Sequence, residues 1–409
     1  MTLPFMRRFL GLCLAGVCLL FTPLNGATAS SPSPAPGKPA TTQSKTVLSP
    51  GIQLAQTLST VTGIAISPLL GVGVVGCWQY FKAPSGQRAG LPWYAQPWFW
   101  LPALLIVGLM ATKDVVGAAL PPGLKKPIDF VEAIENKLSG LIATGALIPM
   151  MGTLLSAAGM QVNGALAGTG LAFIDGTALL QLAATPFALV AYGLVWMASH
   201  AIHVLILLSP WGAVDAALKA LRTALLSALA AISTLNPWWG ACFSVVLIIV
   251  SYYLAGWSFR LTVQGWVFCW DFFSLRRTRF QPGTSVNWAF AARRIGQAPI
   301  RTYGRLAQTQ SGDLEFRYRP WLVLPEKSEL LGQPSSLTIG KALLHPTLER
   351  ERPEGALTLL NFPPRYRTHE VALAQSHGLQ IVEIGVLGGL KWIGRAIKEL
   401  LGLAPASAA

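Results

Sequence analysis

The run from Trp266 to Arg279 divides this chain into two kinds of sequence. Tryptophan and phenylalanine alternate along its first part, and Arg276, Arg277 and Arg279 follow. Aromatic rings of this kind favour the membrane–water boundary, and arginines directly behind such a belt usually mark its cytoplasmic side. Long apolar stretches precede the run, whereas a compact basic stretch follows it. The sequence therefore predicts a membrane-embedded helical module joined to one soluble domain.

Charged residues are scarce and unevenly placed. They make up 12% of the 409 residues, against roughly 25% in a soluble domain. No Asp or Glu occurs before Asp114, and none occurs between Asp215 and Asp271. A charge within hydrocarbon costs several kcal/mol, so gaps of this kind are typical of membrane-crossing helices.

A crossing helix needs about 20 apolar residues, and five stretches are long enough or nearly so. The segment 213–234 is different, because Asp215, Lys219 and Arg222 fall on one helical face. We expect it to lie in the interface as an amphipathic helix, with a sixth crossing as the alternative. The five expected spans are roughly 54–78, 97–112, 138–160, 177–208 and 238–262.

The first residues are typical of a bacterial secretory signal. Arg7 and Arg8 precede an apolar run, and Ala27-Thr28-Ala29 forms a small-x-small cleavage site. An uncleaved signal anchor is the alternative. Five crossings from an extracytoplasmic start would bring Arg276 to the cytoplasm of a multi-pass inner-membrane protein. The expected domains are a signal peptide (1–29), a disordered Ser/Pro-rich linker (30–50), the helical membrane domain (51–275), a basic β-rich domain (276–378), an amphipathic helix (379–402) and a tail (403–409).

Three polar residues stand out within or beside the apolar helices. His200 and His203 share one face of the fourth span, where they could begin a metal site or a proton relay, or form hydrogen bonds between helices. Asp175 directly precedes that span, as a helix cap or as a proton carrier. We expect the interhelical and capping roles.

Carboxylates also line the entry to the third span. Asp129, Glu132 and Glu135 step by three and therefore share a helical face. Acidic residues suit the first turns of a helix, whose dipole favours negative charge. We expect a solvated face, with a cation or a basic partner as the alternative ligand.

The spacing of prolines and acids in the membrane module resembles an uncharacterised bacterial multi-pass family, a domain of unknown function. The resemblance covers residues 54–262. It implies a membrane module and implies no catalytic residue. It rests on Lys113-Asp114, Pro121-Pro122 and Pro127-x-Asp129 within 101–149, and on the stretch from Ser199-His200 to Asn236-Pro237.

After residue 284 the pattern changes to short strands separated by turns. In Leu314–Arg319 apolar and charged residues alternate, which is typical of a half-buried antiparallel strand. A helix from about Gln380 to Leu401 is expected to follow. Six or seven strands closed by one helix resemble a pleckstrin-homology-like or other small barrel. The predicted strands are Ser285–Phe290, Ile300–Gln308, Leu314–Leu324, Ser335–Leu344, Ala356–Asn361 and Glu370–Gln375.

The basic domain is the main indication of function. From Arg276 to His377 there are fifteen Lys or Arg against eight Asp or Glu. A basic domain beside a bilayer favours anionic headgroups over nucleic acid. The plainer alternative is a positive-inside topology signal with an ordinary solvated surface. We therefore expect a non-enzymatic scaffold or assembly factor, without a cofactor, whose partners are membrane lipids or a protein. The candidate contacts are Arg276, Arg277, Arg279, Arg293 and Arg294.

The alternative function is a transporter or channel-like protein that uses Asp175, His200 and His203 along a pathway. Helices interrupted by glycine and proline are compatible with such a site. The biological process, the substrate and the oligomeric state remain open at this point.

Overall fold

The structure is a computed structural model that describes residues 49–117, 122–209, 211–342, 344–352 and 355–383. The expected signal peptide, nearly all of the linker, the tail and residues 384–402 of the expected terminal helix lie outside these ranges. By their internal contacts the described residues form two units. The helical unit comprises 49–117, 134–199 and 216–253, and the β-unit comprises 122–133, 200–215 without 210, and 254–383.

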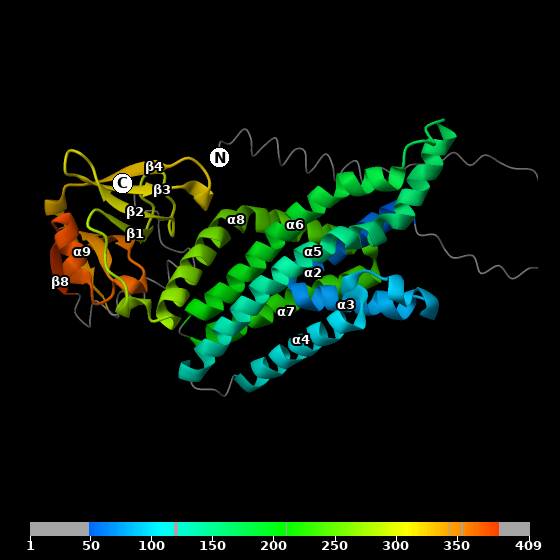
Figure 1. Cartoon of the computed structure of the whole chain (residues 1–409), viewed down its shortest axis with the longest axis horizontal. Helices are drawn as coiled ribbons and strands as arrows, with labels where there is room; N and C mark the ends of the chain where they lie inside the picture. Colours follow the sequence, from blue (N-terminus) through cyan, green and yellow to red (C-terminus); the bar gives the residue numbers. More distant parts are fainter. Residues whose placement is uncertain (1–48, 118–121, 210, 343, 353–354, 384–409) are drawn as a thin grey trace, which may run out of the picture. The chain divides into compact units, whose positions relative to one another are not determined.

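Helices make up most of the described residues between 50 and 273, and several of them belong to both units (Figure 1). Short 3-10 turns, η1 (Ser85–Gly90) and η2 (Trp93–Ala95), connect the early helices. The helices are α2 (Pro50–Ile66), α3 (Pro68–Lys82), α4 (Pro97–Gly117), α5 (Pro122–Gly168), α6 (Gly176–Leu208), α7 (Gly212–Leu235) and α8 (Pro237–Phe273).

Four helices of the described chain are long and apolar enough to cross a membrane. This finding supports a membrane protein, as predicted. The count of five is not confirmed, because Pro97–Lys113 is a shorter apolar helix. The four helical stretches are Asp129–Ser156, Gly176–Leu208, Gly212–Leu235 and Pro237–Phe273.

The first expected span, 54–78, is not a continuous helix. It is divided at Ser67 into α2, of 17 residues, and α3, of 15 residues. Pro68 lacks an N–H group and restricts the residue before it, so the helix ends there and a new one begins. Neither piece reaches the length of a crossing helix.

Helix α7 differs from the expected interfacial helix. It is one of the four crossing candidates, and Asp215 is buried. The guanidinium of Arg222 is turned toward the backbone of Ile66. These two polar residues therefore favour the alternative interpretation, in which a crossing helix turns its polar face inward.

The core of the helical unit is built from α2, α3, α5 and α6, with contributions from α7 and α8. Small residues let these helices approach closely. A side chain at Gly76 would meet the carbonyl of Tyr94, so this glycine is needed where α3 passes η2. The largest fully buried side chains are Ile64, Tyr94, Leu147, Met150, Met151 and Leu155.

The β-unit contains one mixed sheet of eight described strands, in the order β4-β3-β2-β1-β7-β6-β5-β8. All neighbours are antiparallel except β5 and β8. The strands are β1 (Val286–Ala291), β2 (Tyr303–Gln308), β3 (Leu314–Tyr318), β4 (Lys327–Gly332), β5 (Leu337–Lys341), β6 (Thr347–Arg350), β7 (Leu357–Asn361) and β8 (Gln380–Glu383).

The sheet is open, so the expected closed barrel is not confirmed. Two antiparallel meanders, β1–β4 and β5–β7, meet where β1 pairs with β7 over two residue pairs. Strands β4 and β8 are the outer strands. The buried core includes Ala289, Leu306, Phe316, Tyr318, Ile339, Leu348, Leu360, Phe362, Tyr366 and Leu373.

One predicted strand near the C-terminal end was wrong, and the predicted terminal helix was wrong over its first four residues, the only ones that the structure describes. Residues Glu370–His377 form helix α9, which follows the 3-10 turn η6 (Pro364–Tyr366), where a strand was expected. Gly378 ends α9 with a positive φ of 66°, a conformation that suits glycine. Residues 380–383 then form β8, where the terminal helix was expected to begin.

The third predicted strand was too long. It extends over Leu314–Tyr318 and ends before Pro320, where the turn η4 (Pro320–Leu322) begins. Trp321 and Leu322 have positive φ values of 56° and 62°, which take the chain out of the sheet. Leu322–Leu324 therefore lie in an exposed loop, the β3–β4 loop.

Candidate functional site

Helix α8 enters the β-unit without a linker. Its second half, from Leu254 onward, belongs to that unit. Asp271, near its end, has a fully buried side chain, and Arg365 Nε of η6 donates to its Oδ2 at 2.6 Å. Arg276 Nη1 lies 3.7 Å from Asp271 Oδ1 and is half exposed. A buried carboxylate must be paired to remain charged, so this contact fixes the helix end to the sheet.

The aromatic run is only partly a boundary belt. Phe268 packs edge-on against Phe290 of β1 and against His345. Trp270 and Phe272 remain exposed. Part of the aromatic run therefore contacts the β-unit, and part of it is exposed.

The turn after α8 is also attached to the β-unit. His369 Nε2 donates to the carbonyl of Arg277 at 2.8 Å. Earlier along α8, Arg260 Nε donates to the carbonyl of Ile300 at 2.9 Å. The guanidinium of Arg301 lies over the Trp257 ring at 5.7 Å. Contacts thus run along α8 from Trp257 to its end.

The five candidate arginines fall into two groups. Arg276, Arg277 and Arg279 occupy η3 (Arg276–Thr278) and the residue after it, and all three are exposed. Arg293 and Arg294 follow β1, where Arg293 is half-buried and Arg294 is exposed. The five arginines thus come from two separate segments of the chain. One of them, Arg276, is paired with the carboxylate of Asp271.

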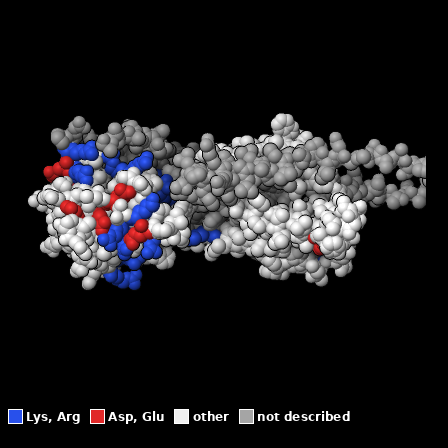
Figure 2. All heavy atoms as spheres, turned by 90° about the horizontal axis from the view of Figure 1, so that it is seen from above, with Lys and Arg blue, Asp and Glu red and all other residues white. Residues whose placement is uncertain are grey.

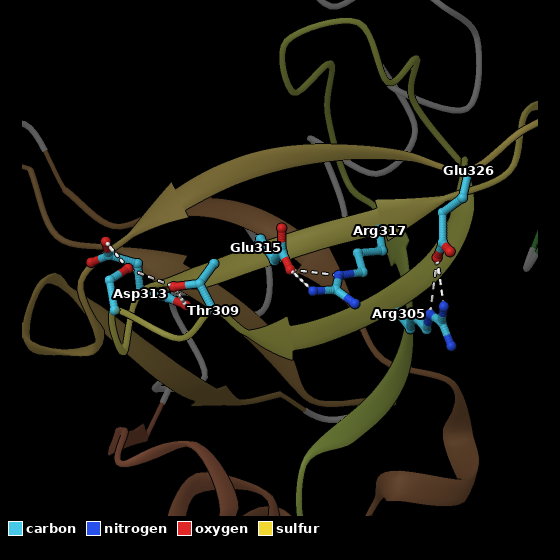
Figure 3. A network of polar contacts seen from close by, with 7 residues as sticks. Arg305, Thr309, Asp313, Glu315, Arg317 and Glu326 are labelled. Carbon is cyan, nitrogen blue, oxygen red and sulfur yellow. Dashed lines mark hydrogen bonds and ion pairs between the residues drawn. The ribbon is translucent and has the colours of Figure 1, made fainter.

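Lysine and arginine side chains gather over the β-unit, whereas the visible face of the helical unit is almost free of them (Figure 2). Several of these cations are paired. Arg305 and Arg317 are cross-strand partners on β2 and β3, and Figure 3 shows how each is matched by a carboxylate. Arg305 Nη2 lies 2.7 Å from Glu326 Oε1, and Arg317 contacts Glu315. Hydrogen bonds and opposite charge from Arg305 also lower the pKa of Glu326.

The two histidines of α6 meet partners from two other helices. His200 and His203 are both buried. Trp266 Nε1 of α8 donates to His200 Nε2 at 3.1 Å, and the two rings stack. Because Nε2 accepts this bond, neutral His200 carries its proton on Nδ1. His203 Nδ1 lies 3.6 Å from Glu132 Oε1 of α5.

The carboxylate face of α5 is not solvated, which corrects the expectation. Asp129 and Glu132 are buried, and the hydroxyl of Ser139 donates to the half-buried Glu135. The structure thereby joins two features that the sequence left separate, namely the acidic face and the histidine pair. Since α5 and α6 are long and connected by a short loop, the first turns of α5 reach the last turns of α6.

Asp175 does not join the histidines. It is exposed at the start of α6, where its Oδ1 accepts bonds from the N–H groups of Thr177 (2.9 Å) and Ala178 (3.3 Å). These backbone bonds lower the pKa of its carboxyl. His200 lies about seven turns further along the same helix. The expected capping role of Asp175 is confirmed.

A polar site in the helical unit had no signal in the sequence. The carbonyl of Ile66, at the break between α2 and α3, accepts bonds from Arg222 Nε (3.1 Å) and Nη2 (3.0 Å). The hydroxyl of Ser199 also donates to it, at 2.8 Å. A broken helix exposes a carbonyl that must find a donor inside an apolar bundle. Arg222 and Ser199 together donate three hydrogen bonds to this carbonyl.

Two further histidines of the β-unit, His345 and His377, are buried. Burial lowers the pKa of His345 to about 4 and that of His377 to about 4. Asn287 is oriented by Gly283, to which it both donates and accepts, so its Nδ2 donates to His377 Nε2 at 2.9 Å. His377 is therefore a neutral Nδ1–H tautomer, an acceptor within the core.

No group of three or more His, Cys, Asp or Glu that could hold a metal ion occurs among the described residues. No family model matches the chain, and no curated protein or solved structure matches it.

Proposed function

We propose that this chain is a non-enzymatic scaffold or assembly factor of the bacterial inner membrane, whose basic β-unit binds anionic lipid or a protein partner. The observation that supports it is the continuity of α8 with the β-unit, fixed by Asp271 and Arg365. A domain held on a membrane helix stays close to the bilayer, and those of its cations that come within a Debye length, about 8–10 Å, of the headgroups are attracted to them. Each such cation near an anionic surface contributes about 1 kcal/mol.

The exposed arginines are the part of the β-unit best suited to this role. Arg277, Arg279 and Arg294 are exposed and follow directly on α8 or on β1. Arg305 and Arg317 have carboxylate partners, so they contribute less to an external field. Guanidinium groups bind phosphate through paired hydrogen bonds, which favours phospholipid headgroups as the first ligand.

The lipid contact is testable in the full chain. The protein is reconstituted in nanodiscs with spin-labelled phosphatidylglycerol or phosphatidylcholine, and the immobilised fraction is measured. We expect more immobilised phosphatidylglycerol, and a loss of that excess in Arg277→Gln/Arg294→Gln. The control, Arg305→Gln/Arg317→Gln, removes the same charge from paired positions. Equal immobilisation of both lipids by the parent protein would contradict binding of anionic lipid. A protein would then remain as the proposed partner of the β-unit.

The sidedness of the β-unit is part of the proposal. Helix α4 has 21 residues, of which Pro97–Lys113 form its shorter apolar part, and the proposal takes this helix to cross the bilayer. If α4 to α8 each cross and the α2–α3 pair does not, five crossings from an outside start place the β-unit in the cytoplasm. This placement agrees with the arginines that follow α8.

A single cysteine tests this topology. Ser311 is exposed in the turn between β2 and β3, where its hydroxyl contacts Thr309 and Asp313. Ser311→Cys is introduced with the five native cysteines replaced and is treated with a membrane-impermeant thiol reagent. Labelling only after the inner membrane is permeabilised would support a cytoplasmic location of the β-unit. Labelling once the outer envelope alone is opened would put the β-unit outside and leave four crossings.

A transporter or channel-like protein is the second candidate. The break after Ile66 favours it, as do the buried Glu132, His200 and His203, because transport sites often use broken helices and buried ionisable groups. Asp175 is not part of this version, since it caps a helix. Solute or ion flux into proteoliposomes that is lost in His200→Ala, with the protein still folded, would favour transport over a scaffold.

A further inference from the structure

The β3–β4 loop carries a patch of exposed apolar side chains. Trp321, Leu322, Val323 and Leu324 are consecutive, and their exposed fractions are 38%, 44%, 81% and 40%. Proline stands on both sides, at 320 and 325. The left-handed φ of Trp321 and Leu322 is uncommon for residues with bulky side chains. A loop of this composition would lie exposed in water unless a partner covers it.

The loop is anchored at its base and at its tip. At the base, Glu326 Oε1 accepts bonds from Arg305 Nε at 3.1 Å and Nη2 at 2.7 Å. At the tip, the Trp321 ring lies 4.9 Å from the Phe259 ring of α8. Trp321 also borders Gly256, at which a Cβ would lie 3.9 Å from Cζ2. The apolar patch is therefore attached to one turn of α8.

That turn lies where the charge-free part of α8 ends. No charged residue occurs from Pro237 to Phe259, and Arg260 is the first. A helix of this length spans about 34 Å, enough to cross a hydrocarbon core of about 30 Å. Trp238 and Trp257 stand near its two ends, as aromatic anchors do. The turn that Trp321 contacts is thus at the membrane–water boundary.

We infer that the β3–β4 loop inserts into the same leaflet that α8 leaves, with Leu322, Val323 and Leu324 in the acyl–headgroup region and Trp321 at its edge. The occupant of the apolar patch is lipid, and the loop is a second attachment of the β-unit to the bilayer. The inference rests on α8 crossing the membrane. It does not require the proposed contact with anionic lipid, since apolar burial is independent of headgroup charge.

An environment-sensitive fluorophore tests the insertion. Val323→Cys and Ser311→Cys, each in the background without native cysteines, are labelled with the same nitrobenzoxadiazole reagent. The full chain is placed in nanodiscs of phosphatidylcholine alone, so that electrostatic attraction is absent. Both side chains are exposed, and neither belongs to the hydrophobic core, so both variants should fold.

At Val323 we expect blue-shifted emission, quenching by lipids with doxyl groups on the upper acyl chain, and several-fold weaker quenching by aqueous iodide than at Ser311. Equal iodide quenching at the two sites would overturn the inference. Protection from iodide without quenching by doxyl lipid would also overturn it, because protein would then cover the loop. Failure of the anionic-lipid test with a positive result here would leave the loop insertion intact.

Discussion

Asp271 and Arg365, 94 residues apart in the chain, form a buried ion pair at 2.6 Å where helix α8 ends against the sheet. The carboxylate is fully enclosed, and the side chain of Arg365 is 9% exposed. A second guanidinium, from Arg276, approaches at 3.7 Å from the solvent side. The junction between membrane helix and β-unit is therefore electrostatic at its centre and aromatic around it.

Arg365→Ala should destabilise the β-unit by about 3 kcal/mol or more, because Asp271 would remain buried without its closest partner. The full chain is heated in detergent, and cleavage by a protease at loops of the β-unit reports how much of that unit has unfolded at each temperature. Arg276→Ala is the control, and it should cost less than about 1 kcal/mol, since that pair is half exposed. Similar losses of stability in both variants would show that the buried Asp271–Arg365 pair contributes no more than the exposed Asp271–Arg276 pair.

The β-unit should lose stability as the pH falls from 6.5 toward 4. Burial holds the pKa of His345 at about 4, whereas an unfolded histidine titrates near 6.5. The unfolded state thus binds more protons in this window, so the contribution is complete above pH 6.5 and decreases below it. We expect about 2 kcal/mol of loss between pH 7 and 5 from His345.

Urea unfolding at the two pH values checks this prediction in the parent and in His345→Gln, which cannot titrate. The variant should show a smaller difference between pH 7 and pH 5. His377, whose pKa is also about 4, provides an independent repeat. An unchanged difference in both variants would mean that the histidines are accessible to protons when folded.

Arg222→Leu should destabilise the helical unit by about 2 kcal/mol, because the Ile66 carbonyl at the helix break would lose two charged donors and keep only Ser199. Arg222→Lys, with one donor group, should lie between the two. Resistance to unfolding by sodium dodecyl sulfate in mixed micelles gives the ranking. Equal stability of parent and Arg222→Leu would contradict the capping role.

Gly76→Val should disrupt the packing of α3 against η2, because any side chain at this position meets the carbonyl of Tyr94. A backbone neighbour cannot move aside as a flexible side chain can, and overpacking costs about 1–3 kcal/mol. Gly86→Val is the comparison, since a Cβ there has nothing within 4 Å. The midpoint temperature of thermal unfolding in detergent should therefore fall for Gly76→Val and change little for Gly86→Val.

Some features of the fold followed directly from local sequence. The alternation in Leu314–Arg319 predicted a strand, which forms over Leu314–Tyr318, although Glu315 is buried as well and the strand is not half-buried. The charge-free stretches predicted long apolar helices. Asp175 before an apolar run predicted a helix cap, and its oxygen indeed accepts two backbone N–H groups. Each of these signals lies within a few residues, where a period of 2 or 3.6 or a capping position is decisive.

Other features depended on partners that local sequence does not identify. Residues 380–383 pair with β5 as strand β8, where the sequence predicted a helix. Strand β8 then forms one edge of an open sheet. Glu132 and His203 come from different helices, and Arg222 reaches a carbonyl 156 residues earlier. Many apolar faces in this chain are similar in composition, so sequence could not decide which of them meet. Only the tertiary structure decided that, because the few buried polar groups must each find a partner.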